Sequence, residues 1–233
     1  MMESRIEATT TPALSFSSIW SWDFICRIIG ASFFVYLVIL NAQGLGHFLG
    51  RHPEMGTFHF SVSILAKLSI IMFIGLHCLL FVVRWRPIEK SRGPLPRMMA
   101  IAGSFFFFLL AIPQGNPSLW RMIIGTLLLC FGTSLAILAL SRLGRSYSMM
   151  PEARKLVTTG FYSIVRHPMY LSEEIAIAGI VIQSRFPYAL ALFTIHLWIQ
   201  IQRMKNEEKV LLNTFPEYQG YKLRTARLIP HVY

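Results

Sequence analysis

The sequence predicts an all-α fold, a polytopic membrane helical bundle of five to six transmembrane helices. Of its 233 residues, 54% are hydrophobic and only 14% are charged, and the mean hydropathy is +0.52. Soluble domains average about 45–50% apolar and about 25% charged residues, so this chain has too few charges to cover a water-exposed surface. The composition also excludes a disordered chain, collagen and a secreted disulfide scaffold.

A second observation is a series of apolar runs, several of them long enough to cross a bilayer. A hydrocarbon core about 30 Å thick requires about 20 apolar residues per helix. The third run is short and stops at Pro113, and a polar break at Gln183-Ser184-Arg185 turns the last two into a predicted helical hairpin. Six spans result if this hairpin crosses the membrane, and five if it only dips into the bilayer. The runs cover residues 24–40, 60–83, 98–112, 119–140, 175–182 and 186–201.

Loop charges are the third observation, and they predict the orientation. The chain has 22 Lys+Arg against 11 Asp+Glu, a formal net charge of +11, and the basic residues concentrate in residues 84–97, 142–170 and the tail from residue 203. Cytoplasmic loops of membrane proteins carry an excess of Lys and Arg. We therefore expect these segments and both termini in the cytoplasm. Basic loops on anionic lipid explain the charge, so we expect no nucleic-acid partner.

Composition divides the chain into three parts. Residues 1–20 are polar and Ser/Thr-rich and lack the basic start of a secretory signal, and residues 21–141 supply the N-terminal transmembrane helices. Residues 142–233, which include the hairpin and the tail, hold most of the polar chemistry and are expected to carry the functional site. No metal site is predicted, because no HxxxH or HExxH spacing occurs and the three cysteines lie far apart inside apolar runs.

An Arg-His-Pro turn is the first candidate site. Pro168 disfavours a helical conformation at His167, which predicts a turn or a helix start whose free N–H groups suit an anion. Arg166 carries a planar fork that fits a carboxylate or phosphate, and the imidazole of His167 exchanges protons near neutral pH. Tyr162 and Tyr170 offer flat faces to an aromatic ring or a cation. Together these residues predict a site for a small zwitterionic cofactor at the membrane surface.

The alternative for this turn is an ordinary interfacial loop. The same tripeptide also occurs at residues 51–53, in a loop predicted to lie outside. A second cluster follows the last apolar run, where Arg203 and Glu207 are four residues apart and able to pair on one helical face. Burial of such a pair costs desolvation and would indicate a functional role, and the alternative, which the spacing leaves open, is a solvated helix end with extended basic side chains.

Other polar residues of the C-terminal region leave alternatives open. We expect one of Glu173 and Glu174 to complement the dipole of the helix after Pro168 and the other to face a ligand cavity. His196 and Gln200, four residues apart, either line that cavity or are satisfied within the helix bundle. The aromatic and basic tail is either a surface helix on lipid or a cap over the site.

In three places the chain resembles the isoprenylcysteine carboxyl methyltransferase family, whose wider relatives are the membrane phospholipid methyltransferases. The resemblance covers roughly residues 142–233. It implies a multi-span membrane enzyme that uses S-adenosylmethionine in a cytoplasmic C-terminal cofactor-binding region. It also implies a lipophilic acceptor, most simply a carboxylate such as that of a prenylated cysteine. The matching places are the stretch Leu156–Tyr170, the pair Glu207-Glu208, and the ending with Phe215, Tyr218, Tyr221 and Pro230.

The resemblance also implies roles for individual residues. Arg203 would orient the carboxylate of the substrate, and Glu207 would keep Arg203 in place. Arg154 and Ser172 depart from the family, since many members have His at the first position and Gly at the second. The residues implied to bind the cofactor are Leu156, Tyr162, Arg166, His167, Tyr170, Glu207 and Glu208.

Two other functions fit the same features. Membrane sterol reductases, which use NADPH, have a similar basic turn and a similar Tyr–Tyr–Pro ending. A non-enzymatic lipid-binding protein would also explain the basic loops as headgroup contacts. In each case the expected partners are membrane lipid and a lipophilic small molecule, or a prenylated substrate for the methyltransferase.

Overall fold

The computed structural model describes residues 22–50, 56–106, 117–184 and 186–230. The predicted polar segment 1–20, the first Arg-His-Pro at 51–53, residues 107–112 of the third predicted span and Arg185 lie outside the described residues. The chain is mostly helical, as predicted. Its helices are α1 (Trp22–Gly50), α2 (Thr57–Val83), α3 (Leu95–Phe105), α5 (Leu119–Leu143), α6 (Pro168–Gln183), α7 (Tyr188–Thr214) and α8 (Tyr218–Arg224).

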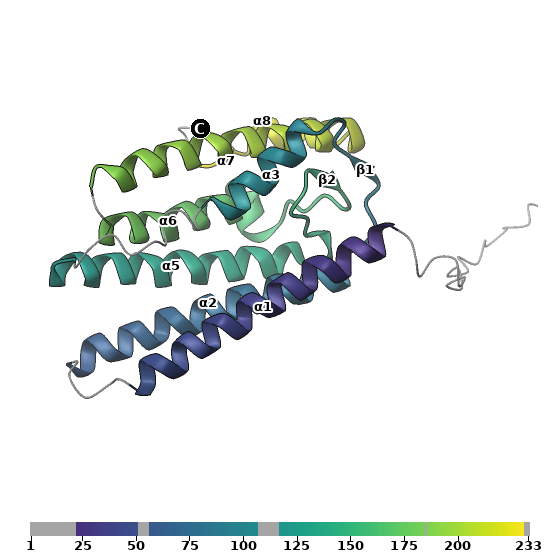
Figure 1. The fold of residues 1–233 in the computed structure, drawn as a ribbon. Helices are drawn as coiled ribbons and strands as arrows, with labels where there is room; N and C mark the ends of the chain where they lie inside the picture. The colour runs from purple at the N-terminus through teal and green to yellow at the C-terminus, as the bar shows by residue number, and fades with distance from the viewer. Residues whose placement is uncertain (1–21, 51–55, 107–116, 185, 231–233) are drawn as a thin grey trace, which may run out of the picture.

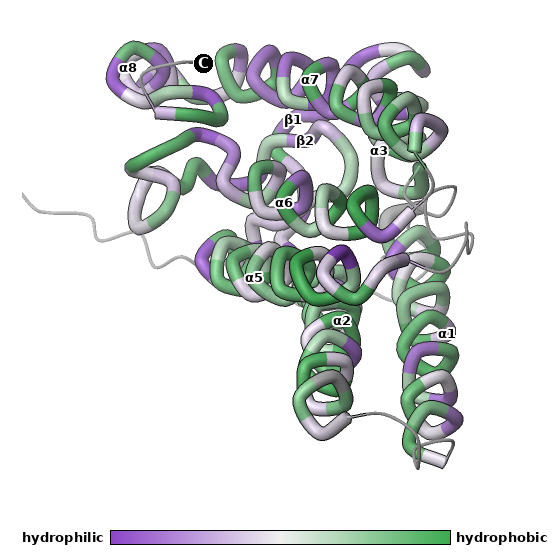
Figure 2. The backbone as a smooth tube through the Cα atoms, turned by 90° about the vertical axis from the view of Figure 1, so that its left-hand side faces the viewer, coloured by the Kyte–Doolittle hydropathy of each residue, from purple (hydrophilic) through white to green (hydrophobic). Residues whose placement is uncertain are grey.

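Three of these helices are long and apolar enough to cross a membrane. They provide the candidate spans Phe24–Gly50, Phe60–Val83 and Leu119–Ser146. Large apolar side chains point outward along them, including Ile29, which is 64% exposed, as expected for contact with lipid. Figure 2 shows hydrophobic residues along α1, α2 and α5 and many hydrophilic residues on α7 and α8. These helices make the chain an integral membrane protein, whereas the total of five to six spans stays a prediction.

Helices α5 and α6 pack against each other more extensively than any other pair in the described part of the chain. Their backbones approach closely because glycines meet at the crossing. A Cβ atom placed on Gly179 would lie 2.3 Å from the carbonyl oxygen of Gly125, and one on Gly132 would lie 2.4 Å from the amide nitrogen of Ala176. Small residues permit such close packing between membrane helices. In Figure 1, α5, α6 and α7 lie one above another, with α2 packed on the far side of α5 and α1 on α2.

Short segments at one end of the bundle bring the loops together. Strand β1 (Glu89–Lys90) pairs antiparallel with β2 (Glu152–Ala153) and joins the loop after α2 to the loop after α5. Two short 3-10 helices, η3 (Gly144–Ser146) and η4 (Gly160–Ser163), shape the chain between α5 and α6. This end holds the polar segments that the sequence singles out.

The C-terminal tail folds back onto the Arg-His-Pro turn. Val165 and Ala226 form a parallel bridge, and the backbone amides of Arg166 and His167 donate to the carbonyls of Ala226 (2.8 Å) and Arg227 (3.1 Å). Of the two predicted arrangements for the tail, the structure has the one in which it returns over the turn.

Candidate active site

A cavity lies where the turn, the tail and α7 meet. Its empty space is about 770 Å³, open solvent at its mouth included. Six of the predicted site residues line it: Leu156, Tyr162, Arg166, His167, Tyr170 and Glu207. Arg203 and Glu208 do not.

The turn is placed by the start of α6. Pro168 is the first residue of the helix and His167 caps it with a non-helical backbone (φ −126°, ψ 58°). A proline fits this place because its missing N–H would have no partner in the first turn and its φ is already helical. The helix start predicted from Pro168 is therefore confirmed, and it presents His167 and Tyr170 to the cavity.

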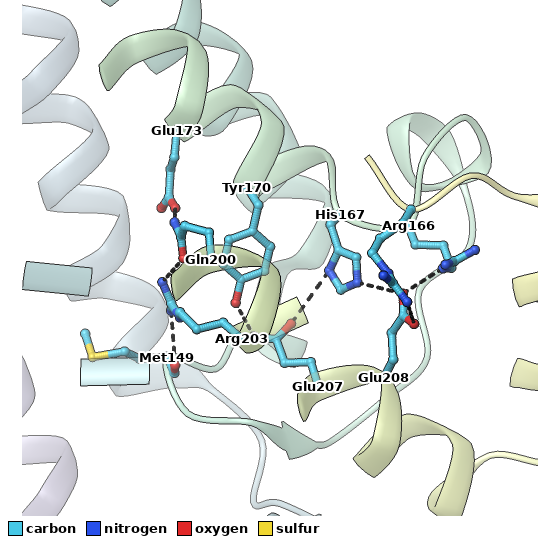
Figure 3. A network of polar contacts seen from close by, with 10 residues as sticks. Met149, Arg166, His167, Tyr170, Glu173, Gln200, Arg203, Glu207 and Glu208 are labelled. Atoms are coloured by element: carbon cyan, nitrogen blue, oxygen red, sulfur yellow. Dashed lines mark hydrogen bonds and ion pairs between the residues drawn. The ribbon is translucent and has the colours of Figure 1, made fainter. Parts of the chain in front are cut away.

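Glu208 is the centre of a buried ionic cluster behind the turn. Its side chain is 3% exposed and accepts hydrogen bonds from Arg166 Nε (2.9 Å) and from Arg227 Nε and Nη2 (2.9 Å each), and His167 Nε2 lies 3.3 Å away (Figure 3). Burial acts to raise the pKa of Glu208, but the hydrogen bonds from His167 and Arg227 outweigh it and hold the pKa well below its usual range. Glu208 thus ties the turn to the tail.

Most of the hydrogen bonds that Arg166 donates go to this cluster and to the tail. Its Nε donates to Glu208, and its Nη1 donates to the carbonyls of Lys222 (3.0 Å) and Thr225. Buried arginines in such networks fix local structure, and fewer of their donors remain for a ligand. Arg166 therefore lines the cavity mainly as an anchor for the tail.

Glu207 faces the cavity from α7, next to Glu208 in sequence. The hydroxyl of Tyr170 donates a hydrogen bond to its carboxylate, and His167 Nδ1 lies 3.8 Å from Glu207 Oε2. Burial raises the pKa of Glu207 above its usual value, against the opposing effect of the charges on His167 and Arg203. The turn and α7 are thus joined at the cavity wall, as the sequence predicts.

Two tyrosines close the cavity on the side of the tail. The hydroxyl of Tyr221 donates to the backbone carbonyl of Tyr162 at 2.5 Å, and both residues line the cavity. Burial raises the pKa of Tyr221 to about 12, and it raises that of Tyr162 further. Both phenols are therefore neutral at physiological pH.

The predicted pairing of Arg203 with Glu207 is wrong. Arg203 is 4% exposed, and its Nη1 donates to Gln200 Oε1 (2.7 Å) while Nη2 lies 3.4 Å from the carbonyl of Met149. Its guanidinium lies 5.0 Å from the ring centroid of Tyr170, and Arg203 does not line the described cavity. Close packing of α3 on α7 sets this position, because a Cβ on Gly103 would lie 2.5 Å from Arg203 Cδ.

The other polar residues of α6 and α7 pair with one another. Gln200 Nε2 donates to Glu173 Oε2 (3.1 Å), and His196 Nδ1 lies 3.1 Å from Glu174 Oε1. His196 Nε2 also lies 3.2 Å from the carbonyl oxygen of Gly103. None of the four side chains lines the described cavity, so the expectation that one glutamate faces it is not met. They join α6, α7 and α3 instead.

Three polar groups in the cavity wall lack partners. Ser146 Oγ, Tyr218 OH and Arg154 Nη1 are buried without a hydrogen-bond partner among the described residues, and all three residues line the cavity. Buried polar groups are nearly always hydrogen-bonded, so these three groups can serve a polar ligand or water in the cavity. Sequence reasoning missed Ser146, which belongs to no motif, whereas Arg154 was visible only as a departure from the family pattern.

Comparison with known proteins finds similar sequences for this region of the chain. Residues 120–218 match the phospholipid methyltransferase family. The protein-S-isoprenylcysteine O-methyltransferase of Saccharomyces cerevisiae is 32% identical over 117 residues, which cover 47% of this chain and 49% of that protein. The chain is similar to the isoprenylcysteine carboxyl methyltransferases over this region. It spans about half the length of this curated relative.

The resemblance predicted to these methyltransferases is thereby confirmed, and the family match begins earlier than expected, at the start of α5. A nickel-cobalt-cadmium resistance protein of Alcaligenes xylosoxydans is 24% identical over 136 residues, 49% of this chain and 64% of that protein. A solved structure of the eukaryotic intramembrane Ras methyltransferase aligns over 90% of this chain and 93% of its own, with 19% identity and a TM-score of 0.45. All the predicted site residues fall within 120–218.

Proposed function

We propose that the protein is an integral membrane methyltransferase that uses S-adenosylmethionine and acts on a lipophilic acceptor. One observation supports this most directly: within the family match, the Arg-His-Pro turn and Glu207 meet in a single cavity. The expected acceptor is a carboxylate, such as that of a prenylated cysteine. The kinship with protein-S-isoprenylcysteine O-methyltransferases supports this choice.

The topology follows from the loop charges. We propose that the cavity faces the cytoplasm together with both termini, because the basic segments surround it. Helices α6 and α7 would form the hairpin that brings the bundle to five or six spans. The 16 residues of α6 are fewer than the roughly 20 needed for a straight crossing, which favours a hairpin that dips into the bilayer.

The cavity wall offers groups that suit this donor. S-adenosylmethionine supplies a methyl group on a positively charged sulfonium, which favours aromatic faces and carboxylates nearby. Tyr162 and Tyr170 would provide the faces and Glu207 the negative charge. The unpartnered Ser146 Oγ and Tyr218 OH would bond its polar atoms. The residues present therefore fit the donor.

The protein's part in the reaction is mainly alignment. A carboxylate acceptor is already ionised at neutral pH and needs no general base, so the site must hold the two reactants in line and exclude water. An amine acceptor would have to lose a proton, and Glu207, with its raised pKa, is a base at the cavity wall that could accept it. Arg203 does not line the cavity but contacts the ring of Tyr170, which does, so we assign it a positioning role that acts through that ring.

Binding measurements in detergent test the assignment. Isothermal titration of the purified protein should show micromolar binding of S-adenosylmethionine and of its demethylated product, with no binding of NADPH. Binding of NADPH alone would replace the proposal by a reductase. Binding of none of the three would leave a non-enzymatic membrane protein.

Two substitutions in α7 test the site. Glu207→Ala and Arg203→Ala are each expected to lower kcat/KM for methyl transfer to a prenylcysteine analogue by at least about 100-fold, which is about 2.7 kcal/mol. The first substitution removes the carboxylate that accepts a hydrogen bond from Tyr170, and the second removes the guanidinium that packs on the Tyr170 ring. Labelled methyl incorporation in vesicles measures the effect. Lys205→Ala, an exposed position on the same helix, should retain normal turnover. Normal turnover in either site variant would remove that residue from the site.

A further inference from the structure

Arg154 is a buried cation at the cavity wall that the turn and the tail do not use. It follows β2 directly, and its side chain is 0% exposed. Its Nε donates to the backbone carbonyl of Trp85 at 2.7 Å, which fixes the guanidinium in place. Nη2 lies 2.8 Å from Glu152 Oε2, and Nη1 has no hydrogen-bond partner among the described residues.

The other cations at the cavity are placed differently. Arg166 already donates through Nε and Nη1 within the ionic cluster. Lys155 is exposed, and its ammonium lies 5.5 Å from the centroid of the Trp85 ring. Of the described cations that line the cavity, Arg154 thus combines full burial with unused donors. A buried guanidinium has five N–H donors in a planar fork, and unmet donors there are costly.

Glu152 gives this end of the cavity a second charge. Glu152 lines the cavity, and its carboxylate accepts a hydrogen bond from Ser148 Oγ at 3.1 Å, so it too is held in place. The cation and the anion together are complementary to a zwitterion: the fork matches a carboxylate, and the carboxylate of Glu152 matches an ammonium. Ser146 Oγ, also unpartnered, lines the same cavity and can donate a further hydrogen bond.

We propose that Arg154 and Glu152 bind the α-amino-acid end of the methyl donor, with Arg154 on its carboxylate and Glu152 on its ammonium. The inference rests on the proposed function. It assigns the carboxylate of the methyl donor to Arg154 and not to Arg166, whose N–H groups already donate to Glu208 and to the tail. Arg154 is then a binding residue of the site.

A comparison of two ligands on the full chain tests this. Decarboxylated S-adenosylmethionine keeps the sulfonium, the nucleoside and the ammonium but lacks the carboxylate. Wild-type protein should bind S-adenosylmethionine about 10- to 100-fold more tightly than this analogue. Arg154→Leu should bind both ligands equally, with the affinity for the analogue unchanged, and Arg154→Lys should keep part of the preference. Glu152→Gln should weaken both ligands by the same factor.

Arg145→Leu is the matched control. Arg145 also donates to a backbone carbonyl, that of Val83 at the end of α2, and its guanidinium lies 5.3 Å from the centroid of the Trp85 ring, but it is exposed and does not line the cavity. It should keep the full preference for the carboxylate. An unchanged preference in Arg154→Leu would overturn the inference while leaving the proposed function standing, as would equal binding of both ligands by the wild type. Binding of neither ligand by the wild type would overturn both.

Discussion

Glu208→Gln is expected to destabilise the protein by about 3 kcal/mol and to lower its Tm by about 6–12 °C. The carboxylate is buried among Arg166, His167 and Arg227, and its loss leaves these groups without their shared counter-charge. The tail would then detach from the turn, so donor binding should fall as well. Thermal unfolding and titration with S-adenosylmethionine, both in detergent, measure the two effects.

The matched control is Glu217→Gln, an exposed position at the start of α8. It removes the same charge from the same end of the protein and should leave the Tm within about 1 °C, since exposed charges contribute little. Equal Tm values for the two variants would show that the buried cluster does not hold the tail.

The pH dependence of this effect has a definite sign. The folded protein lowers the pKa of Glu208, so its contribution to stability is complete above the unfolded pKa of about 4.3 and is lost as the pH falls toward the folded value. The difference in unfolding free energy between wild type and Glu208→Gln should therefore reach its maximum at about pH 6–7, which is about two units above that pKa. It should shrink progressively below about pH 4. A difference that stays constant with pH would contradict the assigned charge state.

Gly179→Ala should have the largest effect among single-methyl additions. The new Cβ would lie 2.3 Å from the carbonyl oxygen of Gly125, a backbone atom that cannot rotate away. Helices α5 and α6 would have to separate, which we expect to cost about 3 kcal/mol, at the upper end of the usual range for overpacking. Detergent-solubilised protein should show a Tm lowered by about 6–12 °C.

Gly75→Ala is the control, and it is expected to change the stability of the protein in the opposite direction. This glycine lies within α2, and a Cβ there would have nothing within 4 Å. Alanine favours a helix over glycine by about 0.5–1 kcal/mol, so this variant should be as stable as the wild type or slightly more stable. If Gly179→Ala behaved in the same way, the close crossing of α5 and α6 would be refuted.

The sequence predicts the local parts of this site well. Pro168 determines where α6 starts, because a proline without an N–H fits the first turn and restricts the residue before it. The apolar runs give the positions of the long helices, because a lipid environment requires continuous apolar stretches. The charged residues from Arg203 to Glu208 are correctly predicted to lie on a helix that follows an apolar run.

Local spacing in the sequence does not determine the long-range contacts. Arg203 turns away from Glu207 because Gly103 opens room for it on α3, and no spacing in the sequence relates residues 103 and 203. Glu208 was predicted to bind the cofactor, but its partner Arg227 comes from the returning tail, whose path depends on tertiary packing. Tertiary packing determines which groups a buried side chain contacts. Helical spacing specifies only that two residues lie on the same face of a helix.

The backbone pairing of residues 165–167 with residues 226 and 227 also affects the order of events during synthesis. A growing chain can thread all of its apolar helices into the bilayer before the ribosome has made Arg227. Until that residue emerges, Glu208 lacks one of its cations and the turn lacks its backbone partners. A translation product cut short before this point would therefore have its apolar helices but lack the ionic and backbone contacts that hold the turn.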